Sequence, residues 1–154
     1  MSRGAKSDTA NPTNVAALLE EASLSMKSDL TGTLARLESG YRACLDGGDR
    51  PGAGAIACAL SRGWARKKSP ARSVHYARKS TLLAPENKSS WTTLAKTCEL
   101  VALRCDSGSE SRRAKVLFAA SARAFKKAAS MTSDPEDKRW LLELASDAAK
   151  QAQG

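Results

Sequence analysis

The chain has 154 residues and a formal net charge of +9 at pH 7, and its length suits a single domain. Hydrophobic residues make up 42% of it, which excludes general disorder, and no run of about 18 apolar residues is present to span a membrane. Alanine occurs 28 times, whereas valine and isoleucine together occur 5 times. Because alanine favours helices and β-branched residues favour strands, the composition predicts an all-α protein.

The positive charge is concentrated in the middle of the chain. Residues 1–49 carry 5 basic and 7 acidic groups, residues 50–127 carry 17 and 4, and residues 128–154 carry 3 and 5. Such a basic centre favours an anionic partner, although the same charges would also suit an ordinary solvated surface.

The four cysteines form no CxxC pair; they are Cys44, Cys58, Cys98 and Cys105. Cysteines scattered in this way are typical of free thiols packed as small apolar residues in a reducing compartment. The polar N-terminus has no apolar segment that would suit a secretory signal. We therefore expect a cytoplasmic protein, with an organelle or the nucleus as the alternative compartment.

Residues 1–13 are polar and predict a flexible tail, followed by one helical domain over residues 14–152. We expect Asn14 to cap the first helix, and Asp29 or Thr31 to cap the second, because short polar side chains accept hydrogen bonds from free N–H groups at helix starts.

Glycines and prolines mark the ends of the next helices. Gly47 and Gly48 should end the second helix, and Pro51 should open the third. The basic turn 66–68 ends the third helix, and Ser69 is expected to cap the fourth.

Three further helices complete the prediction. The turn at 84–87 contains Pro85 and precedes a helix over 88–104. A loop at 106–109 separates it from a long helix at about 110–131, and Asp134 should cap the seventh helix. Across the predicted helices, the apolar faces are expected to include Leu45 in the second, Leu82 in the fourth, Val116 in the sixth and Trp140 in the seventh.

An internal repeat is visible in the second helix of each predicted hairpin. Tyr41, Ala77 and Phe125 are each followed three positions later by a small residue and then by a proline-containing turn. The interval from Pro51 to Pro85 is shorter than the interval from Pro85 to Pro135, so the last unit is longer.

This pattern resembles the tetratricopeptide repeat, a helix–turn–helix unit of about 34 residues, which is the interval between Pro51 and Pro85. Residues 54–100 match best, with Trp91, Leu94 and Ala95 opening a unit after Pro85. The chain departs from the family where Ser61 replaces a glycine and Ser73 replaces an alanine.

The resemblance implies antiparallel helical hairpins stacked as a short right-handed solenoid of about seven helices. An ordinary helical bundle is the alternative.

Enzyme signatures are missing from the sequence. It contains no G-x-x-x-x-G-K-S/T phosphate loop, no H-E-x-x-H and no G-x-S-x-G, and His75 is its only histidine. We therefore expect no enzymatic activity, metal, cofactor or small-molecule substrate.

The resemblance also implies a concave groove lined by the first helix of each hairpin. Arg62 and Lys96 are separated by one repeat length and would lie side by side there, with Thr92 and Arg66 one turn away on either side. Such a basic groove would suit an acidic or extended peptide, which makes a protein–protein adaptor the first functional hypothesis. Alternatively, these cations pair with acids such as Glu99.

The densest basic cluster lies in the turn that contains Lys67, Lys68 and Arg72. It ends at a helix N-terminus, where free N–H groups also favour anions. Together with Arg112 and Arg113, this cluster would suit the phosphate backbone of RNA. An RNA- or ribonucleoprotein-associated protein is therefore the alternative hypothesis.

Overall fold

The computed structural model describes residues 12–105 and 111–154, and these ranges contain only α-helices and the turns between them. The all-α prediction is confirmed. Most of the predicted tail, the loop at 106–109 and Glu110 lie outside the described residues. The helices are α1 (Pro12–Ser25), α2 (Leu30–Asp46), α3 (Arg50–Arg66), α4 (Pro70–Leu83), α5 (Lys88–Arg104), α6 (Ser111–Ser130) and α7 (Pro135–Gln153).

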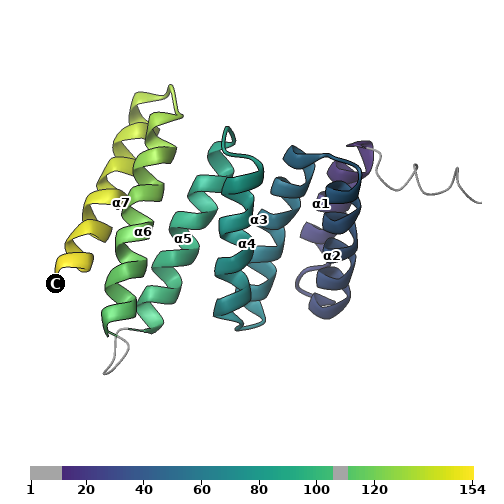
Figure 1. The fold of residues 1–154 in the computed structure, drawn as a ribbon, viewed down its shortest axis with the longest axis horizontal. Coiled ribbons are helices and arrows are strands. Elements are labelled where there is room, and N and C mark those ends of the chain that lie inside the picture. The colour runs from purple at the N-terminus through teal and green to yellow at the C-terminus, as the bar shows by residue number, and fades with distance from the viewer. Residues whose placement is uncertain (1–11, 106–110) are drawn as a thin grey trace, which may run out of the picture. The chain divides into compact units, whose positions relative to one another are not determined.

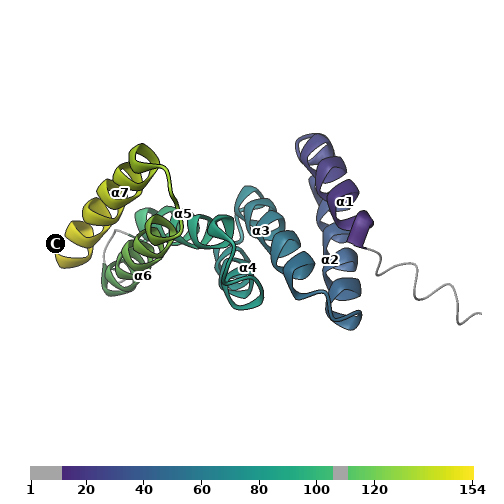
Figure 2. The same cartoon turned by 90° about the horizontal axis from the view of Figure 1, so that it is seen from above.

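The chain folds as two compact units, Met1–Ala84 and Pro85–Gly154 (Figure 1). In the first unit, α1 packs against α2 and α3, and α3 packs against α2 and α4. In the second unit, α6 packs against both α5 and α7 (Figure 2). Figure 1 shows the chain reversing direction in the short turns between α2 and α3, between α3 and α4, and between α6 and α7.

Short polar side chains begin four of the helices. The accepting residue is Asp29 for α2, Asp49 for α3, Asn87 for α5 and Asp134 for α7, and each accepts a hydrogen bond from a backbone N–H two or three positions later. Two predicted caps differ. α1 begins at Pro12, so Asn14 lies inside it, and Ser69 precedes α4 without forming a side-chain capping bond to any described residue.

Buried serines join adjacent helices within each unit. Ser61 Oγ of α3 donates to Ser73 O of α4, and Ser73 Oγ donates to Ser61 O, both at 2.8 Å. In the second unit, Ser121 Oγ of α6 donates to Ala95 O of α5, also at 2.8 Å. These serines are fully buried, so the bonds satisfy hydroxyl groups that would otherwise be costly to bury.

The second unit has a small core around Phe125 and a polar contact at one end. The core contains Ala95, Ala124, Phe125, Ala128, Leu141 and Ala145. Lys88 at the start of α5 pairs with Asp137 in the first turn of α7, and this hydrogen bond lowers the pKa of Asp137. The pair ties the ends of α5 and α7 together.

Four residues expected on apolar faces are exposed instead. Leu82 is 64% exposed, Val116 is 59% exposed, Trp140 is 58% exposed and Leu45 is 42% exposed. The buried positions of α7 are Leu141, Ala145 and Ala148, which form one narrow stripe facing α6. Trp140 precedes Leu141 in the chain but lies about 100° from it around the helix, outside this stripe, so its side chain is exposed.

The turns on either side of α3 have the same backbone geometry. Gly48 has φ of 76° and Lys68 has φ of 61°. Asp49 N donates to Cys44 O in the first turn, and Ser69 N donates to Trp64 O in the second. A left-handed residue is therefore required at both places, but only the first turn supplies a glycine.

Replacing Lys68 with glycine should raise the free energy of unfolding by about 0.5–1 kcal/mol. The left-handed conformation costs a side-chain-bearing residue about 1–2 kcal/mol, and relief of this strain outweighs the entropy that glycine adds to the unfolded chain. Chemical denaturation measures the change. Lys68→Ala removes the same charge but keeps the strain, so it should give no such gain. An equal gain in both variants would contradict this account.

A second prediction concerns the contact of α3 with the end of α4. A Cβ added at Gly54 would lie 2.7 Å from Ala84 Cβ and 3.3 Å from Ala84 N. Gly54→Ala should therefore lower the free energy of unfolding by about 1 kcal/mol, since the crowding outweighs the gain in helix propensity. In a double-mutant cycle, Ala84→Gly should recover part of this loss. Purely additive effects would contradict the contact.

Candidate functional site

The first unit contains two clefts that are lined by different helices. The α1/α3 cleft has a volume of about 300 Å³ and is lined by residues of α1, α3 and the turn after α1. The α2/α4 cleft has a volume of about 530 Å³ and is lined by residues of α2, the C-terminal end of α3 and α4. Both clefts contain basic residues from the basic middle of the chain, residues 50–127.

One face of α3 forms a side of the α1/α3 cleft. Ala55, Ala59, Arg62 and Arg66 all line it, and their successive spacings of four, three and four positions place them on one helical face. Two alanines thus lie at one end of this face and two arginines at the other. The face therefore changes from small and apolar to cationic along the helix.

The opposite side of the cleft comes from α1 and the residues that follow it. These residues are Leu19, Ala22, Ser23, Met26 and Lys27. Leu19 and Met26 are half-buried, and their side chains face the alanines and arginines of α3 across the cleft. The result is an apolar lining with three cations, Lys27, Arg62 and Arg66.

The charge of the α1/α3 cleft is not neutralised nearby. Its lining contains no acidic residue, and Lys27, Arg62 and Arg66 are exposed. Ion pairs among the described residues involve only Arg36 and Lys88 as cations. Three like charges around one small cleft create a positive potential that favours an anionic ligand.

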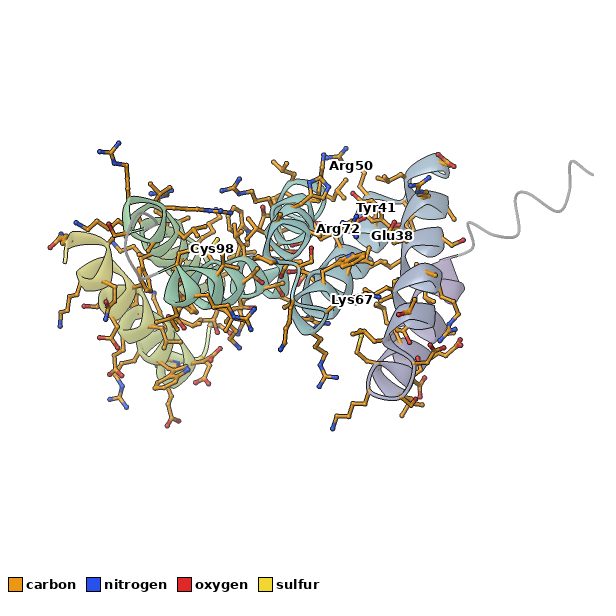
Figure 3. The ribbon with its side chains drawn as sticks, turned by 90° about the horizontal axis from the view of Figure 1, so that it is seen from below. Glu38, Tyr41, Arg50, Lys67, Arg72 and Cys98 are labelled. Atoms are coloured by element: carbon orange, nitrogen blue, oxygen red, sulfur yellow. The ribbon has the colours of Figure 1, made fainter. Side chains whose placement is uncertain are left out.

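The α2/α4 cleft is richer in aromatic residues, but its polar groups bind one another. Lys67 Nζ donates to Thr31 Oγ1 at 2.9 Å. The Arg72 guanidinium lies 4.4 Å from the centre of the Trp64 ring, which is a cation–π contact. Lys67 and Arg72 are labelled in Figure 3.

Tyr76 and Glu38 form the other polar contact of the α2/α4 cleft. The Tyr76 hydroxyl donates to Glu38 Oε1 at 2.9 Å, and the rings of Tyr41 and Tyr76 meet edge to face at 5.5 Å. Glu38 and Tyr41 are labelled in Figure 3. Burial and then the hydrogen bond to Glu38 raise the pKa of Tyr76 to about 12. Burial also raises the pKa of Tyr41. Both tyrosines are therefore neutral at physiological pH.

The site residues predicted from the sequence divide into four groups, three of them in the first unit. Arg62 and Arg66 come together in the α1/α3 cleft, whereas Lys67 and Arg72 line the α2/α4 cleft. Lys68 is exposed in the turn between α3 and α4.

The two remaining predicted site residues lie on α5 in the second unit. Lys96 is exposed, and Thr92 is half-buried and donates its hydroxyl to Ser89 O at 3.1 Å. Because the two units are described separately, the groove joining Arg62 and Lys96 stays a prediction.

The sequence analysis assigns no functional role to four lining residues, Met26, Lys27, Trp64 and Tyr76. Met26 and Lys27 line the α1/α3 cleft, and the sequence held a signal for Met26, because Leu19, Ala22 and Met26 follow helical spacing up to the turn. Trp64 and Tyr76 line the α2/α4 cleft.

The described residues show neither a metal centre nor a membrane span. Within residues 12–105 and 111–154, no group of three His, Cys, Asp or Glu side chains is placed to hold a metal ion. No helix in these ranges is long and apolar enough to cross a bilayer. All four cysteines are buried as thiols.

Comparisons of this chain with protein-family models, with curated proteins and with solved structures find no match.

The raised pKa of Tyr76 gives a test of the α2/α4 cleft. Neutral Tyr76 is favoured in the folded state, so its contribution to stability is complete below about pH 10 and is lost as the pH rises towards about 12. Absorbance at 295 nm should show tyrosine ionising late. Glu38→Gln should lower the pKa of Tyr76, because no carboxylate then accepts a hydrogen bond from the neutral hydroxyl or repels the phenolate. An unchanged titration curve in this variant would refute the contact.

Proposed function

We propose that the chain is a non-enzymatic protein–protein adaptor of the tetratricopeptide kind, which binds an acidic peptide in the α1/α3 cleft. The observation that carries this proposal is the set of exposed cations around an apolar lining: Lys27, Arg62 and Arg66 form no ion pair with any described residue. Carboxylates of a partner would form ion pairs with these cations, and each arginine guanidinium can bind a carboxylate through two hydrogen bonds.

The apolar part of the cleft defines a second requirement for the ligand. Leu19, Ala22, Met26, Ala55 and Ala59 surround a volume of about 300 Å³. Such a space suits one or two apolar side chains, and methionine adapts to different shapes. The preferred peptide therefore combines Asp or Glu residues with a nearby Leu, Met or Phe.

The α2/α4 cleft is a weaker candidate for an acidic peptide, although it is larger. Its own Glu38 contributes a negative charge, Lys67 is bound to Thr31, and Arg72 lies over Trp64. A ligand would have to replace these contacts before it gained new ones. The α1/α3 cleft imposes no such cost on its arginines.

The repeat interpretation is supported by similar hydrogen bonds in the two units. Ser61 and Ala95 are separated by one repeat length, and the backbone carbonyl of each accepts a bond from a buried serine of the following helix. The bonds lie one turn apart along their helices, because Ser61 is the twelfth residue of α3 and Ala95 is the eighth residue of α5. The donors, Ser73 and Ser121, are farther apart in the chain than the two acceptors, since more of α5 follows Ala95 and more of α6 precedes Ser121.

Selection from a phage-displayed library of random peptides on the immobilised full chain tests the function. We expect acidic peptides with an apolar residue to be enriched. Their binding, measured by fluorescence polarisation, should weaken at least about tenfold in Arg62→Glu, which corresponds to about 1.4 kcal/mol. Ala55→Trp should also weaken binding, because it fills the cleft without changing the charge.

The matched control is Arg78→Glu, which makes the same charge change at an exposed position of α4 outside both clefts. It should bind the selected peptides as the unmodified chain does. Equal weakening by Arg62→Glu and Arg78→Glu, or a selection with no preference for acidic residues, would refute the proposal. Circular dichroism confirms that each variant keeps its helices.

A further inference from the structure

Helix α6 in the second unit has one buried face and one strongly basic face. The buried side chains are Ala114, Leu117, Phe118, Ser121, Ala122, Ala124, Phe125, Ala128 and Ala129. The exposed side chains include Arg112, Arg113, Lys115, Arg123, Lys126 and Lys127. The helix contains no acidic residue.

Five of these six cations lie in one row along the helix. At about 100° per residue, Arg112, Lys115, Arg123, Lys126 and Lys127 fall within an arc of about 120°. We call these five residues the α6 basic row. At about 1.5 Å per residue, the row is about 22 Å long. The buried side chains are centred on the opposite side of the helix.

The α6 basic row is not neutralised by its own helix or by ion pairs. None of its members forms an ion pair with a described residue. Lys127 Nζ lies 5.9 Å from the centre of the Trp91 ring, a contact that leaves its charge in place. The first turn of α6 is basic, where the helix dipole disfavours cations, whereas α7 places Glu136 and Asp137 in its first turn. The first turn of α7 thus has the acidic residues that the helix dipole favours, and the first turn of α6 has basic residues instead. Such departures from local preference are common at functional sites.

We propose that the α6 basic row binds the phosphate backbone of single-stranded RNA. A row of cations along one helix matches the row of phosphates along one strand, whereas a duplex presents phosphates in two rows. Binding releases the counterions condensed on the strand. The proposal concerns the second unit and does not depend on peptide binding by the first.

The surroundings of the row favour a backbone ligand over a membrane. The apolar residues of α6 pack against α5 and α7, and Val116 is its one large hydrophobic residue that is exposed. The helix therefore has no apolar face to insert into lipid. Its two aromatic residues, Phe118 and Phe125, are buried, so they offer bases no stacking surface. We therefore expect little dependence on base sequence.

Fluorescence anisotropy with a labelled oligouridine of about 12 nucleotides, measured on the full chain between about 50 and 300 mM salt, tests the row. If all five cations contact phosphates, the slope of log K against log salt should be about −3.5. Arg123→Gln and Lys126→Gln should each make the slope about 0.7 less steep. Arg112→Glu combined with Arg123→Glu should weaken binding at least about tenfold at about 100 mM salt.

Matched controls are Lys138→Gln and Lys150→Gln, which remove the same charge at positions of α7 outside the row. Both should leave the slope unchanged, and so should Arg78→Gln in the first unit, at an exposed position outside both clefts. Equal effects of control and row variants would overturn the proposal, because net charge alone would then explain binding. Failure of the oligouridine to bind would also overturn it.

Two further probes separate the alternatives. Vesicles containing phosphatidylserine should bind more weakly than the oligouridine, and so should an RNA duplex of the same length. Stronger binding to vesicles would assign the row to a membrane surface and overturn the RNA proposal. Stronger binding to the duplex would overturn the assignment to a single strand.

Discussion

The helix pairs of this protein depend on small side chains between adjacent helices. Ser61 and Ser73 exchange hydrogen bonds through each other's backbone carbonyls, and Ser121 binds the carbonyl of Ala95 in the same way. A bulky side chain at any of these positions would separate the helices and leave backbone carbonyls without these bonds. Because the cores consist largely of alanine, little other apolar area is available to compensate for such a separation.

This constraint also explains the composition of the α1/α3 cleft. The buried face of α3 contains Ile56, Leu60 and Ser61, and the next face around the helix carries Ala55, Ala59 and Arg62. Alanines on this face are too small to fill the space beside α1, so a cleft remains. The arginines follow where the helix approaches its C-terminal end, and the dipole stabilises positive charge there. Ala59 belongs to both the buried core and the cleft lining, so the cleft begins at the edge of the packed face of α3.

Local chemistry made much of the fold predictable, because caps and turns depend on a few neighbouring residues. Asp134 and the Gly47–Gly48 stop were predicted correctly for this reason, and Asp29 is the one of the two candidate caps of α2 that forms the capping bond. The exposure of Trp140 was not predictable, because it depends on how much of the surface of α7 is covered by α6. The cleft was predictable only on its α3 side, where Arg62 and Arg66 have a regular spacing. Its other side combines Leu19 and Ala22 of α1 with the turn after α1, and only the folded chain brings these residues beside α3.

The two basic surfaces differ in a way that physical measurements can separate. In the α1/α3 cleft the cations adjoin apolar side chains, so binding gains from excluding water and salt screens only part of it. The α6 basic row is exposed and has few apolar neighbours, so its binding energy comes from counterion release and falls steeply with salt. A ligand that resists salt therefore belongs in the cleft, and one that is lost with salt belongs on the row. The charge of the chain is the same in both cases, and the shape around each charge decides which partner it favours.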